Sequence, residues 1–98
     1  MYDDLKGKTV LITGAGKRDG IGFAIGEKMA SCGCNIVLTD LDSEMEGLTS
    51  LAGELAKRYG VTGTALGLDV TSQDSVNAMI AELKNAAPHI DVLVNNAG

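Results

Sequence analysis

Four short runs of consecutive apolar residues are spaced along the chain, and the third of them is the least apolar. Unbroken runs of this length, rich in Val, Ile and Leu, are typical of strands buried on both faces of a parallel sheet. Polar residues and glycines bound each run, which places the strand ends. The pattern predicts strands at residues 9–13, 35–40, 63–69 and 91–95.

The segment between the first two runs has apolar residues at helical spacing. It predicts a helix that begins near Gly20 and ends by Gly33, because glycine commonly follows the last helical turn. Gly26 inside it weakens the helix, and we expect it to allow a close approach to the sheet. The predicted buried stripe is Ile21, Ala24, Ile25, Met29 and Cys32.

Two further helices are predicted by the same periodicity. The second opens on Ser43-x-x-Glu46, a capping box, and ends at Gly60. The third begins near Thr71 and ends at Pro88. Its predicted buried face is Val76, Met79, Ile80, Leu83 and Ala87.

Strands and helices therefore alternate along the chain, with short connections. Alternation of this kind indicates an α/β fold, a parallel sheet with helices on both faces. Right-handed crossovers favour the strand order 3-2-1-4, in which the fourth strand returns to lie beside the first. The chain of 98 residues is then one domain, residues 1–98, and one half of a doubly wound sheet.

The segment from Gly14 to Gly22 joins the first strand to the first helix and contains four glycines. Strand, glycine turn and helix in this order bring backbone N–H groups to a phosphate, where the helix dipole adds positive potential. The spacing departs from the common G-x-G-x-x-G pattern, since Asp19 stands where a third glycine would follow Gly16. The alternative interpretation of this segment is an ordinary turn.

Polar residues at three other strand ends strengthen the nucleotide-binding interpretation. Asp40 ends the second predicted strand, Asp69 the third, and Asn95 and Asn96 follow the fourth. In a parallel sheet of this order, ligands bind outside the carboxyl ends of the strands, where the strand order reverses. Asp69 and the two asparagines have an alternative interpretation as turn-forming residues.

Composition narrows the class of partner. The net charge of −5 argues against nucleic acid as the main partner, and no apolar run is long enough for a membrane span. The acidic N-terminus is unlike a secretory signal, so we expect a cytoplasmic protein. Cys32, Cys34 and His89 do not form a metal-binding pattern, and the cysteines are expected to be reduced and buried. His89 is expected to be exposed.

The chain resembles the N-terminal part of a short-chain dehydrogenase/reductase, a family with a Rossmann-like fold. The resemblance rests on Thr13-Gly14 with Gly20-Ile21-Gly22, on Asp40, on Asp69-Val70, and on the tetrapeptide Asn95-Asn96-Ala97-Gly98. These pieces occur in the order and approximate spacing of the family. They cover nearly all of this chain but less than half of a usual family member.

The resemblance implies roles for each group of residues. The glycine loop would surround the diphosphate, Asp40 would hold the adenosine ribose, and the pair after the third strand would contact adenine. Asn95 would brace the sheet, and the three residues after it would lie near the nicotinamide-side ribose. The candidate cofactor-binding residues are Gly14, Gly16, Lys17, Arg18, Gly20, Ile21, Gly22, Asp40, Leu41, Asp69, Val70, Asn95, Asn96, Ala97 and Gly98.

Asp40 favours NAD over NADP as the cofactor. A carboxylate at this strand end accepts hydrogen bonds from ribose hydroxyls and repels a 2′-phosphate. Lys17 and Arg18 favour the opposite choice, because basic residues bind phosphate, although both have an alternative interpretation as solvated loop residues.

Two departures from the family pattern are visible. Five residues, 15–19, separate Gly14 from Gly20, where the family usually has three. Some acyl-carrier-protein enoyl reductases have a longer loop of this kind, whereas the intact Gly-Ile-Gly argues against that subgroup. The Tyr-x-x-x-Lys pair of the family lies well beyond position 98. Tyr2 and Tyr59 cannot stand in for its tyrosine, and Tyr59 has no lysine four residues later. We therefore assign no catalytic residue and expect this chain to be inactive alone.

The resulting prediction is the cofactor-binding portion of an NAD(P)-dependent oxidoreductase that acts on an alcohol or carbonyl, for example a 3-oxoacyl reductase. A missing C-terminal half would bind the small-molecule substrate. The alternative is a stand-alone nucleotide-binding module without catalysis. The fourth strand would have an exposed apolar edge, which predicts a homo-oligomer formed through that strand.

Overall fold

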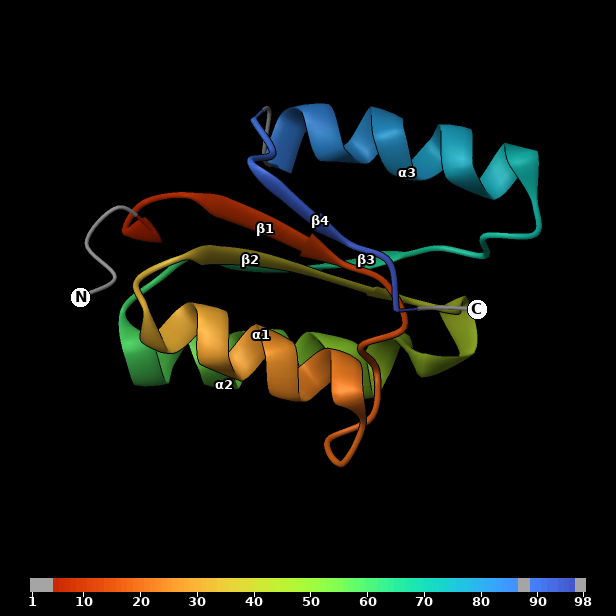
Figure 1. The fold of residues 1–98 in the computed structure, drawn as a ribbon. Helices are drawn as coiled ribbons and strands as arrows, with labels where there is room; N and C mark the ends of the chain where they lie inside the picture. Colours follow the sequence, from red (N-terminus) through yellow and green to blue (C-terminus); the bar gives the residue numbers. More distant parts are fainter. Residues whose placement is uncertain (1–4, 87–88, 97–98) are drawn as a thin grey trace.

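The computed structural model describes residues 5–86 and 89–96 and places four strands in one sheet with helices between them (Figure 1). The elements follow one another in strict alternation, apart from one 3-10 turn before the second helix. They are β1 (Thr9–Ile12), α1 (Ile21–Ser31), β2 (Asn35–Asp40), η2 (Asp42–Glu44), α2 (Met45–Tyr59), β3 (Gly63–Gly67), α3 (Gln73–Ala86) and β4 (Val92–Val94).

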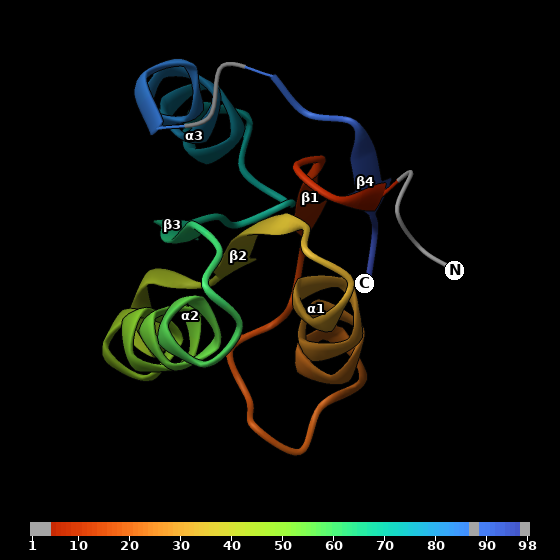
Figure 2. The ribbon, with the colours of Figure 1, turned by 90° about the vertical axis from the view of Figure 1, so that its left-hand side faces the viewer.

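The sheet is parallel and has the order β3-β2-β1-β4, as predicted. Helices α1 and α2 lie side by side on one face, and α3 covers the other face alone (Figure 2). Because every crossover carries the chain back to the same edge, all four carboxyl ends lie together. The Rossmann-like α/β architecture with helices on both faces is therefore confirmed.

Alternate residues of β1, β2 and β3 enter different cores, as the two-residue period of a strand requires. Val10 and Ile12 of β1 join the larger core under α1 and α2, whereas Leu11 joins the smaller one under α3. Both faces of β1 and β2 are consequently buried, which explains their unbroken apolar sequence. The smaller core is made of Leu11, Val37, Leu66, Leu68 and Met79.

The predicted stripe of α1 is wrong in part. Ile25 and Met29 pack against the core, but Ile21 is 72% exposed and Ala24 is also exposed. The fully buried residues are Gly22, Phe23, Gly26 and Ala30. The close approach predicted at Gly26 is confirmed, since a Cβ there would lie 3.2 Å from the end of the Leu38 side chain. Three of the four fully buried residues are small, so a pattern of large apolar residues could not reveal the whole face.

Two predicted helix starts also need correction. The capping box at Ser43 is absent, because residues 42–44 form η2 and α2 begins at Met45 with no side-chain cap. Helix α3 is capped by Ser72 rather than Thr71, since the Ser72 hydroxyl accepts a hydrogen bond from Ser75 N at 3.2 Å. The predicted end of α2 is confirmed: Gly60 has a left-handed φ of 68°.

Smaller differences concern single residues of α3 and the cysteines. Ile80, predicted to be buried, is 43% exposed, and the predicted helix end at Pro88 and face residue Ala87 lie outside the described residues. Both cysteines are free thiols, but only Cys34 is fully buried, and this burial raises the pKa of its thiol. Cys32 is half-buried.

Three strands are shorter than predicted, although backbone hydrogen bonds continue past their ends: Thr13 N donates to Val94 O, and Leu68 N donates to Asp40 O. At the amino end of the sheet, Asp91 Oδ2 accepts a hydrogen bond from Thr9 N at 2.9 Å. This contact, and a weaker one from His89, lower the pKa of Asp91. His89 itself is exposed, as expected. At the other end, residues beyond β1, β3 and β4 border a cleft.

Candidate functional site

A cleft of about 660 Å³ opens at the carboxyl ends of the strands. Its walls come from the segments after β1, β2, β3 and β4 and from the first turn of α1. Four segments distant in sequence therefore meet at the place predicted from the strand order. The lining residues are Thr13, Gly14, Lys17, Gly20, Ile21, Thr39, Asp40, Leu41, Leu68, Asp69, Val70, Thr71 and Asn96.

Asp40 fixes the glycine loop at one side of this cleft. Its Oδ2 accepts a hydrogen bond from Gly16 N at 2.7 Å, and its Oδ1 accepts one from Leu41 N at 2.8 Å. A carboxylate has about four acceptor positions, so two remain for hydroxyl donors of a ligand. A Cβ on Gly16 would lie only 2.6 Å from Oδ2, which explains why this position is glycine.

Thr13 and Asn96 join the other side of the cleft to β4. The Thr13 hydroxyl accepts a hydrogen bond from Asn96 N at 3.0 Å, and its other contacts are to Val94 O and Asn95 Oδ1. The Asn96 amide Nδ2 donates to Gly14 O at 3.0 Å. These bonds hold the start of the glycine loop against the residues after β4, and Asn95 takes part through its contact with Thr13.

Gly22 lies directly behind this connection. A Cβ there would meet Asn96 Nδ2 at 2.8 Å and Gly14 O at 2.9 Å. Helix α1 can therefore approach the loop only because position 22 has no side chain.

The amino end of α1 borders the cleft through Gly20 and Ile21. Gly20 is the N-cap, has extended backbone geometry and makes no side-chain cap. The first turn holds no acidic residue, so its positive potential is not neutralised there. The first N–H groups of a helix have no partner within the helix, and with the positive helix end they are suited to a diphosphate.

Asp69 shapes the wall after β3. Its Oδ1 accepts hydrogen bonds from the Thr71 hydroxyl at 2.6 Å and from Thr71 N at 2.9 Å. These bonds lower the pKa of Asp69. The residue thus forms the turn that its alternative interpretation predicted, and it also lines the cleft, so the two interpretations are compatible.

The side chains of the two loop cations, Lys17 and Arg18, lie in different places. Lys17 lines the cleft, whereas the Arg18 guanidinium bonds Glu54 of α2 at 2.8 Å. From the sequence, Lys17 and Arg18 had the same two interpretations, as phosphate-binding or as solvated loop residues. A loop has no periodicity from which the direction of a side chain can be predicted.

The structure brings most of the predicted site residues together. Gly16, Gly22 and Asn95 support the walls from behind, Arg18 points elsewhere, and Ala97 and Gly98 lie outside the described residues. The cleft-lining residues among those predicted are Gly14, Lys17, Gly20, Ile21, Asp40, Leu41, Asp69, Val70 and Asn96.

Four lining residues were not predicted: Thr13, Thr39, Leu68 and Thr71. Thr13 and Thr39 are the last positions of buried strand segments and are themselves buried. Their place just before the predicted Gly14 and Asp40 is the signal that could have identified them.

The cleft brings together the acceptor oxygens of Asp40, the amino end of α1 and the apolar side chains of Leu68 and Val70. Metal ligands are not gathered anywhere in residues 5–86 and 89–96. Among these same residues, every helix is too short or too polar to cross a bilayer.

Comparison with known proteins gives consistent matches. Residues 14–98 match the family model described as enoyl-(acyl carrier protein) reductase. The 3-oxoacyl-(acyl-carrier-protein) reductase FabG of Aquifex aeolicus is 39% identical over 94 residues, which cover 96% of this chain and 36% of that protein. The chain thus spans about a third of the length of the curated relatives it matches.

Solved structures give the same result. L-sorbose reductase from Gluconobacter frateurii, complexed with NADPH and L-sorbose, matches with a TM-score of 0.89 at 34% identity. The match covers all of this chain and 36% of the reductase chain. A short-chain dehydrogenase from Sphingobium yanoikuyae in complex with NADPH matches with a TM-score of 0.78 at 38% identity, covering 93% of this chain and 34% of its own.

Proposed function

The chain belongs to the short-chain dehydrogenase/reductase family, and we propose that it is the cofactor-binding portion of an NAD-dependent oxidoreductase. Its cleft would hold the adenosine, the diphosphate and the nearer part of the nicotinamide half of the cofactor. The substrate would be an alcohol or carbonyl compound, since the matched relatives are dehydrogenases and reductases of such compounds.

The position of Asp40 carries this proposal. Its carboxylate stands at the edge of the cleft, and two backbone N–H groups hold it there. Ribose 2′- and 3′-hydroxyls are donors at the spacing of one carboxylate, and the remaining acceptor positions of Asp40 suit them. The glycine loop and the first turn of α1 would then face the diphosphate.

The same carboxylate supports NAD rather than NADP. A 2′-phosphate would bring two negative charges toward a fixed one, at an edge where Arg18 is already paired with Glu54. Three matched structures hold NADPH and a fourth holds 5-hydroxy-NADP, which is a property of those proteins. Lys17, the loop cation that lines the cleft, suits the diphosphate of NAD as well as it suits a 2′-phosphate.

A bound nicotinamide ring would accept or donate the hydride of the reaction. The residues of this chain would bind and orient the cofactor. Thr13 and Asn96 would keep the loop after β1 at a fixed distance from the residues after β4, where the nicotinamide half is expected. The groups that transfer the substrate proton would belong to a further part of the protein, since this chain spans only 36% of the matched FabG relative.

Isothermal titration calorimetry of the chain with NAD, NADP and ADP-ribose tests the proposal. We expect NAD and ADP-ribose to bind with similar affinity, because both carry the adenosine and diphosphate that the cleft receives, and NADP to bind more weakly. Heat of binding from none of the three at about 1 mM would contradict the proposal, since even a binding free energy of about −4 kcal/mol is detectable there.

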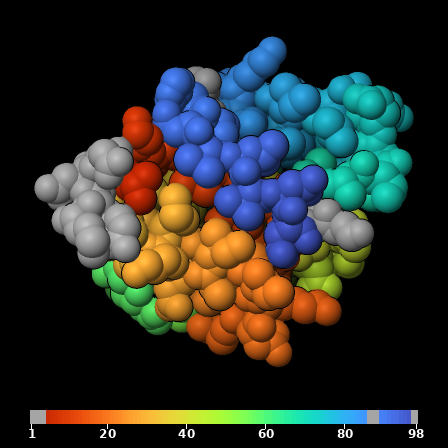
Figure 3. Space-filling view, viewed as in Figure 1, coloured from red at the N-terminus to blue at the C-terminus, as the bar shows by residue number. Residues whose placement is uncertain are grey.

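The edge of β4 offers a partner surface, and we propose that a second copy occupies it when the chain is isolated. Within the described residues β4 pairs with β1 alone, and Leu93 is 62% exposed. The space-filling view shows the β4 segment uncovered at the front surface (Figure 3). An uncovered apolar edge is a template for pairing with another strand.

Light scattering of the 98-residue chain is expected to show a mass that rises with concentration. Leu93→Lys should lower that mass toward the monomer, because charge on an edge strand opposes pairing. The control is Ile80→Lys, an equally apolar exposed residue on α3 that should leave association unchanged. A monomer at every concentration would contradict this prediction.

A further inference from the structure

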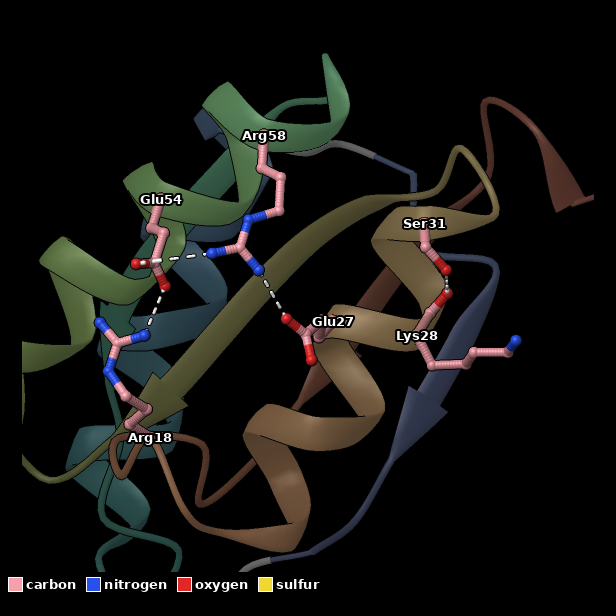
Figure 4. A network of polar contacts seen from close by, with 6 residues as sticks. All are labelled: Arg18, Glu27, Lys28, Ser31, Glu54 and Arg58. Atoms are coloured by element: carbon pink, nitrogen blue, oxygen red, sulfur yellow. Dashed lines mark hydrogen bonds and ion pairs between the residues drawn. The ribbon is translucent and has the colours of Figure 1, made fainter.

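An ion-pair network runs from the glycine-rich loop to α1 and α2 (Figure 4). Arg18 Nη1 lies 2.8 Å from Glu54 Oε2, and Glu54 Oε1 lies 3.8 Å from Arg58 Nη2. Arg58 also reaches Glu27 of α1 at 2.8 Å. The hydrogen bond from Arg18 is the largest cause that lowers the pKa of Glu54, so this carboxylate stays charged at neutral pH.

Arg18 is held outside the cleft by two contacts. Besides its ion pair with Glu54, its guanidinium lies over the ring of Phe23, 5.9 Å from the centroid. Phe23 is buried in the core beneath α1, so this ring is a fixed support. The neighbouring Lys17 lines the cleft, and Arg18 does not.

The loop that carries Arg18 is nevertheless bonded to Asp40, at the side of the cleft where the adenosine ribose is expected (the ribose edge). Gly16, two residues earlier, donates to Asp40 Oδ2 at 2.7 Å. A side chain as long as arginine can turn from this loop toward either α2 or the ribose edge. Arginine binds phosphate through paired hydrogen bonds, and an arginine near this edge can accommodate the 2′-phosphate of NADP.

We infer that Glu54 is a specificity-determining residue, which keeps the cleft selective for NAD by drawing the Arg18 guanidinium away from the position of a 2′-phosphate. The inference rests on the proposed function. Glu54 is on α2, outside the cleft, and would act only through Arg18. It is therefore a positioning residue.

The exposure of the pair sets the size of the effect. The Arg18 side chain is 62% exposed and that of Glu54 is 31% exposed, so solvent screens their attraction. Removing such a pair changes folding little, and it releases Arg18 at small cost. The expected change in affinity is several-fold rather than many orders of magnitude.

Calorimetric titration of the full chain with NAD and with NADP tests the inference in the variant Glu54→Gln. We expect the Kd for NADP to fall about fivefold and the Kd for NAD to stay within about twofold, because only NADP offers a phosphate to the released guanidinium. Arg18→Ala alone should leave both Kd values within about twofold, since the native Arg18 does not serve either cofactor.

Two further variants separate this mechanism from a general change of charge. Glu27→Gln removes the same charge from the same network, but its partner is Arg58, so the preference between NAD and NADP should not change. Combining Arg18→Ala with Glu54→Gln should abolish the gain in NADP affinity.

Each of three results would overturn the inference. These are an unchanged preference in Glu54→Gln, an equal gain in Glu27→Gln, and a gain that persists without Arg18. If Glu54→Gln still binds NAD and its preference between NAD and NADP is unchanged, the inference is overturned but the proposed function is not. Failure of the native chain to bind either dinucleotide overturns the proposed function, and the inference with it.

Discussion

Gly22→Ala is expected to lower the affinity for NAD at least tenfold and to destabilise the fold. The added Cβ would meet the Asn96 amide at 2.8 Å and Gly14 O at 2.9 Å, so α1 must move away from the loop or the Asn96–Gly14 hydrogen bond must break. Overpacking of this kind costs about 1–3 kcal/mol. Calorimetry with NAD and thermal unfolding measure the two effects.

Gly53→Ala is the matched control for this substitution. Gly53 is also a helical glycine, but it is exposed on α2 and its added Cβ would have no neighbour within 4 Å. Alanine is a better helix former, so the variant should gain about 0.5–1 kcal/mol of stability and bind NAD as the native chain does. Unchanged NAD binding in Gly22→Ala would show that the loop does not depend on this contact.

Asp40→Asn is expected to raise the Kd for NAD about tenfold to a hundredfold. The amide keeps the shape of the side chain but loses the charge, and its NH₂ group faces a backbone donor, either Gly16 N or Leu41 N. Hydrogen bonds to a charged group contribute about 1.5–3 kcal/mol each, which corresponds to this range for one lost bond. Discrimination against NADP should also decrease, because the repelling charge is gone.

Asp91→Asn is the control for loss of structure. Asp91 also accepts a backbone hydrogen bond, from Thr9 N at 2.9 Å, but at the opposite end of the sheet. Asp91→Asn should reduce thermal stability about as much as Asp40→Asn does, and it should leave the Kd for NAD unchanged. Equal losses of NAD affinity in the two variants would mean that Asp40 acts through the fold and not at the ribose.

The fold was predicted well because the strongest features of the sequence are its apolar runs. Burying these runs requires contacts between segments that are distant along the chain. Unbroken runs such as Ile36–Val37–Leu38 must be covered on both faces, and this requirement leads to a parallel sheet with helices on both sides. Strand order then followed from the handedness of the connections. The predicted bounds of β2 agree with the structure at both ends.

Local signals were less reliable where a second interaction competes. The pattern Ser43-x-x-Glu46 satisfies a capping box, but the chain forms η2 there instead. The buried face of α1 was predicted only in part, because Gly22 and Gly26 occupy positions on it where large apolar residues were expected. Packing against Ile12 and Leu38 decides that face, and it is visible only in three dimensions.

The candidate site was predictable to the extent that it depends on topology. Strand ends that meet at one edge placed Gly14, Asp40, Asp69 and Asn96 together, and they line one cleft. The direction of Arg18 was not predictable, because its partner Glu54 lies 36 residues later on another element. Side-chain direction in a loop depends on such tertiary partners.

A crystal structure of the chain with NAD tests the central claim most directly. The account predicts an adenosine ribose hydroxyl at about 2.5–3.2 Å from the Asp40 carboxylate and the diphosphate against the first turn of α1. NAD bound elsewhere on the protein, or bound in the cleft with the ribose out of reach of Asp40, would contradict it.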